Sequence, residues 1–230
     1  MLGDAYVAHA REVHDWPYPD QAIRNYAEAT QRLTGGSERL PAIEEPEIHP
    51  VTDDRVDDWR RFFDHDAFVG VPEWAACYCL TPHPSRPPDD DPPHWTENRE
   101  TMTGLLTAGG AYGYLAYVSG RVAGWVNASK RSNYSRPFQP DDGLDPDEVI
   151  GVTCFVIASP YRRHGISARL LARVIADAPG RGARWVEGYP FNSATDNDAH
   201  NFRGPRSLYD RNQFDEIEIR ERDTIVRRAV

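Results

Sequence analysis

The feature that most constrains the fold is a strand–helix–strand pattern in the last eighty residues. The run Val149–Ile157 is almost entirely apolar and predicts a buried strand. A polar turn follows, then a helix from about Gly165 to Ala178 with apolar residues at helical spacing, and then a second strand, Ala183–Gly188. Because strands joined by one helix of this length lie parallel in a sheet, the sequence predicts a parallel crossover here.

The preceding half of the chain predicts antiparallel structure. Two apolar runs, Ala111–Val118 and Val122–Ala128, are separated by a short turn around Gly120, which is typical of a hairpin. Together with the crossover, they indicate an α+β fold in which helices cover both faces of a mixed, mostly antiparallel sheet. The other predicted strands are Ile48–Val51, Trp74–Leu80 and one from about Asp215, and the other predicted helices are Asp53–Phe63, Trp95–Leu106 and Pro205–Asn212.

Residues 1–45 are expected to form an N-terminal helical extension to a main domain over residues 46–230. Apolar residues from Ile23 to Leu33 recur at helical spacing, and Gly35-Gly36 ends the pattern. That apolar face is expected to cover the main domain, a second copy of the chain in a homodimer, or the wall of a substrate pocket.

The charge balance excludes some partners. The formal net charge is −10, from 36 acidic and 26 basic residues, which disfavours nucleic acid and anionic membrane surfaces. No apolar run approaches the roughly 20 residues that span a bilayer, and the first residues lack a signal-peptide pattern. We therefore expect a cytoplasmic protein that binds neither nucleic acid nor membrane.

The three cysteines are expected to be reduced, because an odd number in a chain of this length does not suggest a disulfide framework. Cys77, Cys79 and His83 have a spacing that could also belong to a metal site. We favour two buried thiols in a core strand and no metal. Cys154, inside an apolar strand, is likewise expected to be inert packing.

The turn Arg162-Arg163-His164-Gly165-Ile166-Ser167 is a candidate phosphate site. It leads from a strand into the N-terminus of a helix, where unpaired N–H groups and the helix dipole attract anions. Gly165 permits close approach of the backbone, and Arg162, Arg163 and His164 add donors. An ordinary strand-to-helix connection remains the alternative on these residues alone. The glycine patterns of nucleotide-triphosphate loops and dinucleotide folds are absent.

The same turn resembles the signature of the GNAT (GCN5-related) N-acetyltransferase superfamily, Arg/Gln-x-x-Gly-x-Gly/Ala, with Ser167 as the one departure. Near the end of the chain, Tyr209 to Phe214 resembles the Tyr-x-x-x-Gly-Phe element of that superfamily, with Gln213 in place of glycine. The resemblance covers roughly Glu47 to Arg228. It implies a GNAT-like fold and acetyl-CoA as the acetyl donor.

The resemblance also implies roles for individual residues. The pantetheine arm of coenzyme A would pair with the backbone of Phe155, Val156 and Ile157, whose N–H groups could polarise the thioester carbonyl. The pyrophosphate would meet the N–H groups from Arg163 through His164, Gly165 and Ile166 to Ser167. Tyr209 would be the general acid that protonates the departing thiolate; its alternative role is that of a core or capping tyrosine.

A base is wanted because an aliphatic amine, with a pKa of about 10, is mostly charged at neutral pH. Glu187, at the end of the strand beside the cofactor strand, is our candidate, with Glu148 and water as rivals and an ion pair with Arg184 as the structural alternative. The acceptor is expected to be a small-molecule amine such as an amino acid, a polyamine or an aminoglycoside-like compound. A protein lysine or N-terminus, or a non-catalytic acyl-CoA-binding domain, is the alternative.

Overall fold

The computed structural model describes residues 43–68, 74–84, 95–135, 138–193 and 201–230. The helix predicted around residues 23–33 lies outside these ranges. None of the helices within these ranges is both long and apolar enough to cross a membrane.

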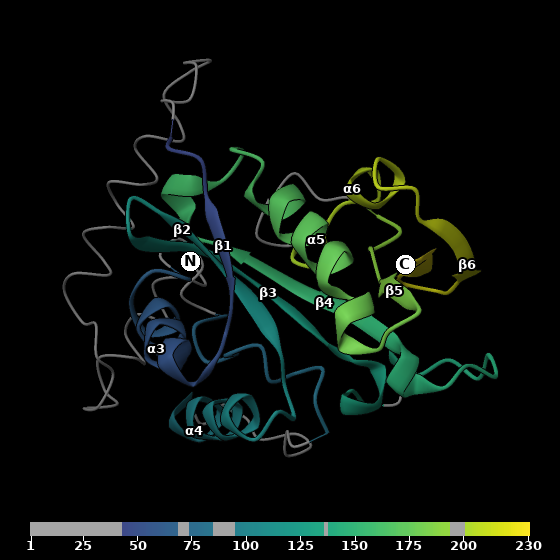
Figure 1. Cartoon of the computed structure of the whole chain (residues 1–230), viewed down its shortest axis with the longest axis horizontal. Helices are drawn as coiled ribbons and strands as arrows, with labels where there is room; N and C mark the ends of the chain where they lie inside the picture. The colour runs from purple at the N-terminus through teal and green to yellow at the C-terminus, as the bar shows by residue number, and fades with distance from the viewer. Residues whose placement is uncertain (1–42, 69–73, 85–94, 136–137, 194–200) are drawn as a thin grey trace, which may run out of the picture.

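Within these ranges seven strands form one mixed sheet, in the order β1-β2-β3-β4-β5-β7-β6 (Figure 1). The strands are β1 (Glu47–Pro50), β2 (Gly113–Val118), β3 (Arg121–Lys130), β4 (Val149–Ile157), β5 (Trp185–Gly188), β6 (Asp215–Ile219) and β7 (Thr224–Ala229). The helices are α3 (Val56–His65), α4 (Trp95–Thr107), α5 (Ile166–Asp177) and α6 (Arg206–Asp210).

Of the strand pairs in the described part of the chain, only β4 and β5 run parallel, and α5 connects them. The predicted hairpin is the antiparallel pair β2 and β3. These two features confirm the predicted fold class. The strand predicted from Asp215 is β6, and β7, which was not predicted, forms a hairpin with it and lies between β5 and β6.

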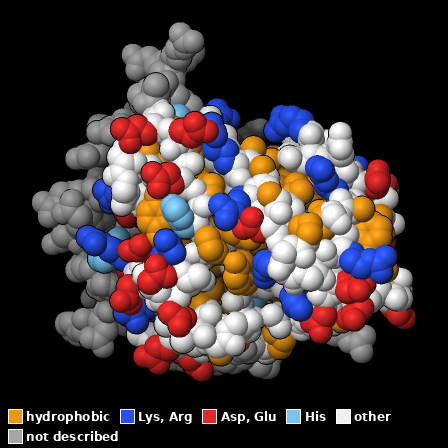
Figure 2. All heavy atoms as spheres, in the orientation of Figure 1, with side chains coloured by type: hydrophobic (Ala, Val, Ile, Leu, Met, Phe, Trp, Pro, Cys, Tyr) orange, Lys and Arg blue, Asp and Glu red, His pale blue; other side chains and the backbone are white. Residues whose placement is uncertain are grey.

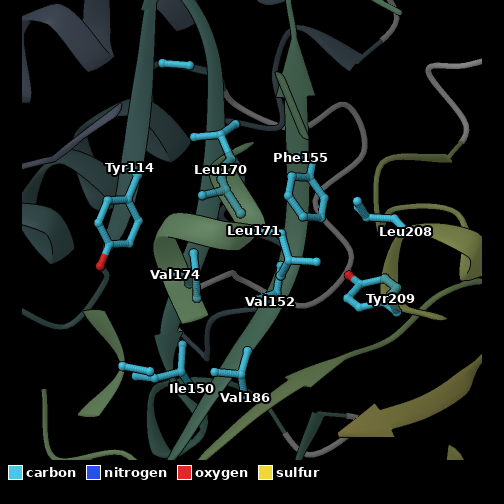
Figure 3. Close-up of a cluster of buried hydrophobic side chains, with 14 of the residues drawn as sticks. Tyr114, Ile150, Val152, Phe155, Leu170, Leu171, Val174, Val186, Leu208 and Tyr209 are labelled. Carbon is cyan, nitrogen blue, oxygen red and sulfur yellow. The ribbon is translucent and has the colours of Figure 1, made fainter. Parts of the chain in front are cut away.

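Helices cover both faces of the sheet because its central strands are apolar on both sides. Along β2, Tyr114 belongs to the core beneath α5 and the next residue, Leu115, to the core beneath α3 and α4. Figure 3 shows Leu170, Leu171 and Val174 of α5 on the first face. The second core is rich in aromatic rings, including Trp59, Phe62, Phe63 and Trp125, which lie edge to face or tilted against one another.

The strand predicted over Trp74–Leu80 is wrong. The segment is a series of turns, in which the N–H of Cys77 donates to Trp74 and that of Leu80 donates to Cys77. Tyr78 and Cys79 both have positive φ, 44° and 52°, which an extended strand does not allow. The segment is apolar at every position, and successive side chains in it are buried, including Ala75, Ala76, Tyr78, Cys79 and Leu80. Consecutive turns can bury side chains that are next to each other in the sequence.

The departure at Gln213 carries backbone strain. Gln213 follows α6 with φ of 59°, so the position where the superfamily has glycine is left-handed here too. A residue with a side chain is strained by about 1–2 kcal/mol in this conformation, and glycine removes that strain. Glycine is also more flexible in the unfolded chain, which lowers the gain in stability by about 0.5–1 kcal/mol. We expect Gln213→Gly to stabilise the protein by about 0.5–1 kcal/mol, measured by urea denaturation.

The control for this prediction is Arg211→Gly, two residues earlier. Arg211 is exposed and has φ of −64° and ψ of −22°, so glycine relieves no strain there and should destabilise the protein. Equal effects of the two substitutions would contradict the strain at Gln213.

Candidate active site

A cavity of about 640 Å³ opens where β4 continues beyond its pairing with β5. The parallel pairing ends at Val152 and Gly188, yet β4 extends to Ile157. Residues 153–157 of β4, the turn into α5 and the segment from Asn201 to Leu208 all line the cavity. On the other side of the sheet the cavity reaches residues next to α3 and α4, including Phe68, Trp74 and Asn98. It therefore passes through the sheet at the free edge of β4.

The backbone conformation of the turn before α5 leaves an open space beside Gly165. Arg163 and Gly165 have φ of 65° and 77°, on either side of His164. A Cβ at Gly165 would meet no atom within 4 Å, so the space above this position is empty of protein. The first amides of α5, those of Ile166 and Ser167, have no intrahelical partner because they begin the helix. This combination of a compact turn and a helix start suits an anion such as a pyrophosphate.

Two side chains brace the turn. Arg162 Nε donates to the carbonyl of Ile157 at 3.0 Å, and His164 Nδ1 donates to the carbonyl of Arg162 at 2.8 Å. Arg162, Arg163, Gly165, Ile166 and Ser167 lie in the cavity wall, whereas His164 does not. The predicted phosphate donors are thus brought together, with His164 placed as a support for the turn.

Of the three strand residues that the sequence suggested for the cofactor, two face the open edge of β4 and one does not. The N–H of Phe155 donates to the carbonyl of Phe202 at 2.6 Å, away from β3, and the N–H of Ala158 donates to Ala123 in β3. Because successive residues of a strand face opposite edges, Phe155 and Ile157 present their backbone to the cavity, while that of Val156 faces β3. Val156 lines the cavity with its side chain.

Tyr209 is buried behind this edge. Its ring lies against Gly188, where an added Cβ would come within 2.1 Å of the ring, and its hydroxyl donates to the carbonyl of Arg203 at 2.6 Å. In Figure 3 the oxygen of Tyr209 points toward β4. Tyr209 is not among the described residues of the cavity wall, and burial raises the pKa of its hydroxyl well above the ordinary value.

Glu187 is fully buried in a network of ions. Its Oε1 accepts from Arg131 at 3.1 Å and from Arg227, and its Oε2 accepts from the Tyr189 hydroxyl at 2.9 Å. Asp142 also pairs with both arginines. Glu187 does not lie in the described wall of the cavity.

The rival carboxylate, Glu148, precedes β4 at the end opposite the turn, and Arg184 is its ion partner at 3.4 Å. The described wall contains no aspartate, glutamate or histidine.

The thiols gather at the cavity. Cys77, Cys79 and Cys154 all line it, and Cys79 Sγ lies 3.1 Å from Cys154 Sγ. Burial raises the pKa of Cys79, which keeps it in the thiol form. His83 is bonded to Asn127 and Asn133 instead, and no cluster of three or more metal-ligating side chains occurs in the described ranges.

Some residues of the cavity wall could not be identified from the sequence. Arg203, Phe138 and Trp74 come from loops far apart in the chain and meet only in the fold. Arg203 precedes Gly204-Pro205, which predicted nothing more than a break before a helix.

The fold and the cavity define an enzyme of the acyltransferase type, in which a strand edge and a helix start share one ligand site. The acetyltransferase (GNAT) family model matches residues 49–201. The chain therefore belongs to the GNAT family of acetyltransferases, enzymes that use acetyl-CoA. No curated protein matches the chain in sequence.

Solved structures with the same fold include PaiA N-acetyltransferase from Thermoplasma acidophilum in complex with coenzyme A. It is 10% identical with a TM-score of 0.50, over 81% of this chain and 100% of that one. A ribosomal-protein-alanine N-acetyltransferase from Brucella melitensis is 16% identical with a TM-score of 0.50, over 80% and 99%. The GNAT domain of S. lividans PAT is 12% identical with a TM-score of 0.50, over 80% and 90%. At these identities the similarity concerns the fold.

Proposed function

We propose that the enzyme transfers the acetyl group of acetyl-CoA to the primary amine of a small molecule by direct attack on the thioester. The observation that carries this proposal is the single cavity that runs from the turn at Gly165, along the open edge of β4, to the opposite face of the sheet. A donor held on one face and an acceptor entering from the other would meet at Phe155.

The residues of the turn fit the donor. The backbone at Gly165 and the first amides of α5 would hold the pyrophosphate, with Arg162 and Arg163 adding positive charge. The edge of β4 would hold the pantetheine arm through Phe155 and Ile157. The N–H of Phe155 is bonded to Phe202, so binding there requires Phe202 to give up this hydrogen bond.

In the transfer, the amine nitrogen forms a bond to the thioester carbon, the carbon–sulfur bond breaks, and the amine loses one proton as the thiolate gains one. An N–H on the β4 edge would stabilise the negative charge that develops on the carbonyl oxygen. Tyr209 would supply the proton to sulfur, and water would take the proton from the amine. Glu187 is not retained as the base, because both of its oxygens are engaged in the buried network.

The cofactor site is tested by thermal unfolding with and without acetyl-CoA. A ligand at about 100 times its Kd stabilises a protein by about 2.7 kcal/mol, which for a chain of this size raises Tm by about 5–10 °C. We expect that rise in the wild type and less than half of it in Gly165→Ala, because the left-handed turn is strained and the methyl group fills the space above it.

Gly109→Ala is the matched control. Gly109 also has positive φ, 75°, with no atom within 4 Å of an added Cβ, but it lies after α4 and outside the cavity wall. It should lose similar stability and keep the full response to acetyl-CoA. A response in Gly165→Ala equal to that of the wild type would place the pyrophosphate elsewhere.

Release of free thiol over a panel of amines then tests the transfer. Binding of acetyl-CoA without thiol release from any small amine, but with acetylation of a peptide, would favour a protein acceptor. Binding without any acetylation would favour a non-catalytic acyl-CoA-binding domain.

A further inference from the structure

Beyond the donor site, the described cavity wall contains Arg203 and Arg211, and Arg203 is the one next to the reacting edge of β4. Arg203 follows Phe202, whose carbonyl accepts the N–H of Phe155. The Arg203 carbonyl in turn accepts from the Tyr209 hydroxyl. The bond to Tyr209 remains when the N–H of Phe155 is released to the donor, and it holds Arg203 beside the position proposed for the thioester.

The guanidinium of Arg203 is incompletely satisfied. Its Nη1 pairs with Asp223, a carboxylate that it shares with Arg220, whose Nε lies 2.6 Å from Asp223. Its Nε is buried and has no hydrogen-bond partner. Burial lowers the pKa of Arg203, which is the direction expected for a cation held away from water. A buried donor on a cation favours an anionic acceptor of hydrogen bonds.

Aromatic rings surround the same group. The guanidinium carbon lies 4.6 Å from the ring centre of Phe191, 5.1 Å from that of Phe138 and 5.9 Å from that of Phe202. These rings hold the guanidinium in place on one side of the cavity.

The remaining wall on this side of the sheet is mainly apolar, and Thr81 and Asn98 in it are uncharged. Phe68, Trp74, Leu80 and Phe138 line it, and the amide nitrogen of Asn98 is already bonded to the Ala76 carbonyl at 2.8 Å. Polycations are bound by carboxylates, and the described wall holds none. On the face seen in Figure 2, acidic and basic side chains are interspersed, so the surface there does not form one anionic patch either.

We propose that Arg203 binds a carboxylate of the acceptor, which is an amino acid with an apolar or aromatic body. This inference rests on the proposed acetyl transfer to a small amine. The guanidinium of Arg203 would donate to the carboxylate, the apolar wall would receive the side chain, and the amine would face the β4 edge. Polyamines and aminoglycosides, which carry several positive charges, are disfavoured by the same guanidinium.

The test compares pairs of acceptors that differ only in the carboxylate. Thiol release is measured with phenylalanine against phenethylamine, leucine against 3-methylbutylamine, and 6-aminohexanoate against pentylamine. Loss of a hydrogen bond to a charged group reduces binding by about tenfold to a hundredfold. We expect kcat/KM for the favoured acid to exceed that of its decarboxylated partner by this factor, mainly through KM. In Arg203→Gln the preference should vanish, and in Arg203→Lys part of it should remain.

Arg220→Gln is the control, because Arg220 shares Asp223 but does not lie in the described wall of the cavity. It should keep the preference for the acid. If the wild type acetylates the decarboxylated amines as well as or better than the acids, the inference is overturned while the proposed function stands. This comparison uses only the wild-type protein, so its result does not depend on whether a variant folds. If no amine of either series releases thiol although acetyl-CoA binds, the proposed function fails, and the inference fails with it.

Discussion

Replacement of Glu187 by alanine is expected to cost about 3–5 kcal/mol of the free energy of unfolding, because it leaves two buried guanidinium groups with Asp142 as the one carboxylate they still share. Glu187 is 0% exposed, and Arg131 and Arg227 are 1% and 8% exposed. Urea denaturation of the variant measures this loss. Glu187→Gln keeps the shape but removes the charge, and should lose a similar amount.

Glu148→Ala is the matched control. Its ion pair with Arg184 is exposed, so its loss should cost no more than about 1 kcal/mol. Glu148 and Glu187 are also the two carboxylates that the sequence suggested as bases. A Glu187→Gln variant with wild-type stability and greatly reduced kcat would argue for the base and against the structural role.

The ion network around Glu187 also makes the stability of the protein depend on pH in the acid range. Burial raises the pKa of Asp142, but hydrogen bonds from Arg131 and Leu144 outweigh this and lower it to about 2. A carboxyl with a lowered pKa stabilises the fold above its unfolded value, near 3.9, and the stabilisation is lost as the pH falls toward 2. The charge on Asp142 therefore contributes through the whole neutral range.

The sequence predicted the part of the site that is local. The strand, turn and helix from Val149 to Ala178 are continuous in the chain, and their apolar periodicity and glycine position are specific enough to be read directly.

The sequence could not predict the parts that depend on distant segments. Glu187 is 56 residues from Arg131 and 40 from Arg227, and nothing in the strand pattern selects these partners over Arg184. The same is true of Arg203, whose guanidinium meets Asp223 and rings from three other positions only after the sheet forms. The run Trp74–Leu80 is apolar throughout, and a short apolar run does not show whether it is buried as a strand or, as here, as successive turns.

Tyr209→Phe is expected to slow turnover by about tenfold to a thousandfold, the usual scale of acid–base assistance, if the hydroxyl protonates the departing thiolate. Its raised pKa keeps the phenol protonated at neutral pH, as an acid must be. A coenzyme thiol, with a pKa of about 8.5, is a fair leaving group, so the reaction should slow without stopping. The measurement is kcat and KM for acetyl-CoA, followed by thiol release.

The competing role of Tyr209 is to hold the carbonyl of Arg203, and the two roles predict different changes. Loss of an acid lowers kcat and leaves KM for acetyl-CoA unchanged, whereas loss of the bond to Arg203 raises KM for the acceptor and lowers stability by about 1–3 kcal/mol. Gly188→Ala provides a second variant, because its methyl group would overlap the Tyr209 ring and displace the hydroxyl without removing it. An unchanged kcat in Tyr209→Phe with the fold retained would remove the acid role. The Tyr209 hydroxyl lies behind the cavity wall and is bonded to Arg203, which is proposed to hold the acceptor. If Tyr209→Phe changes only the KM for the acceptor, Tyr209 is a positioning residue for Arg203.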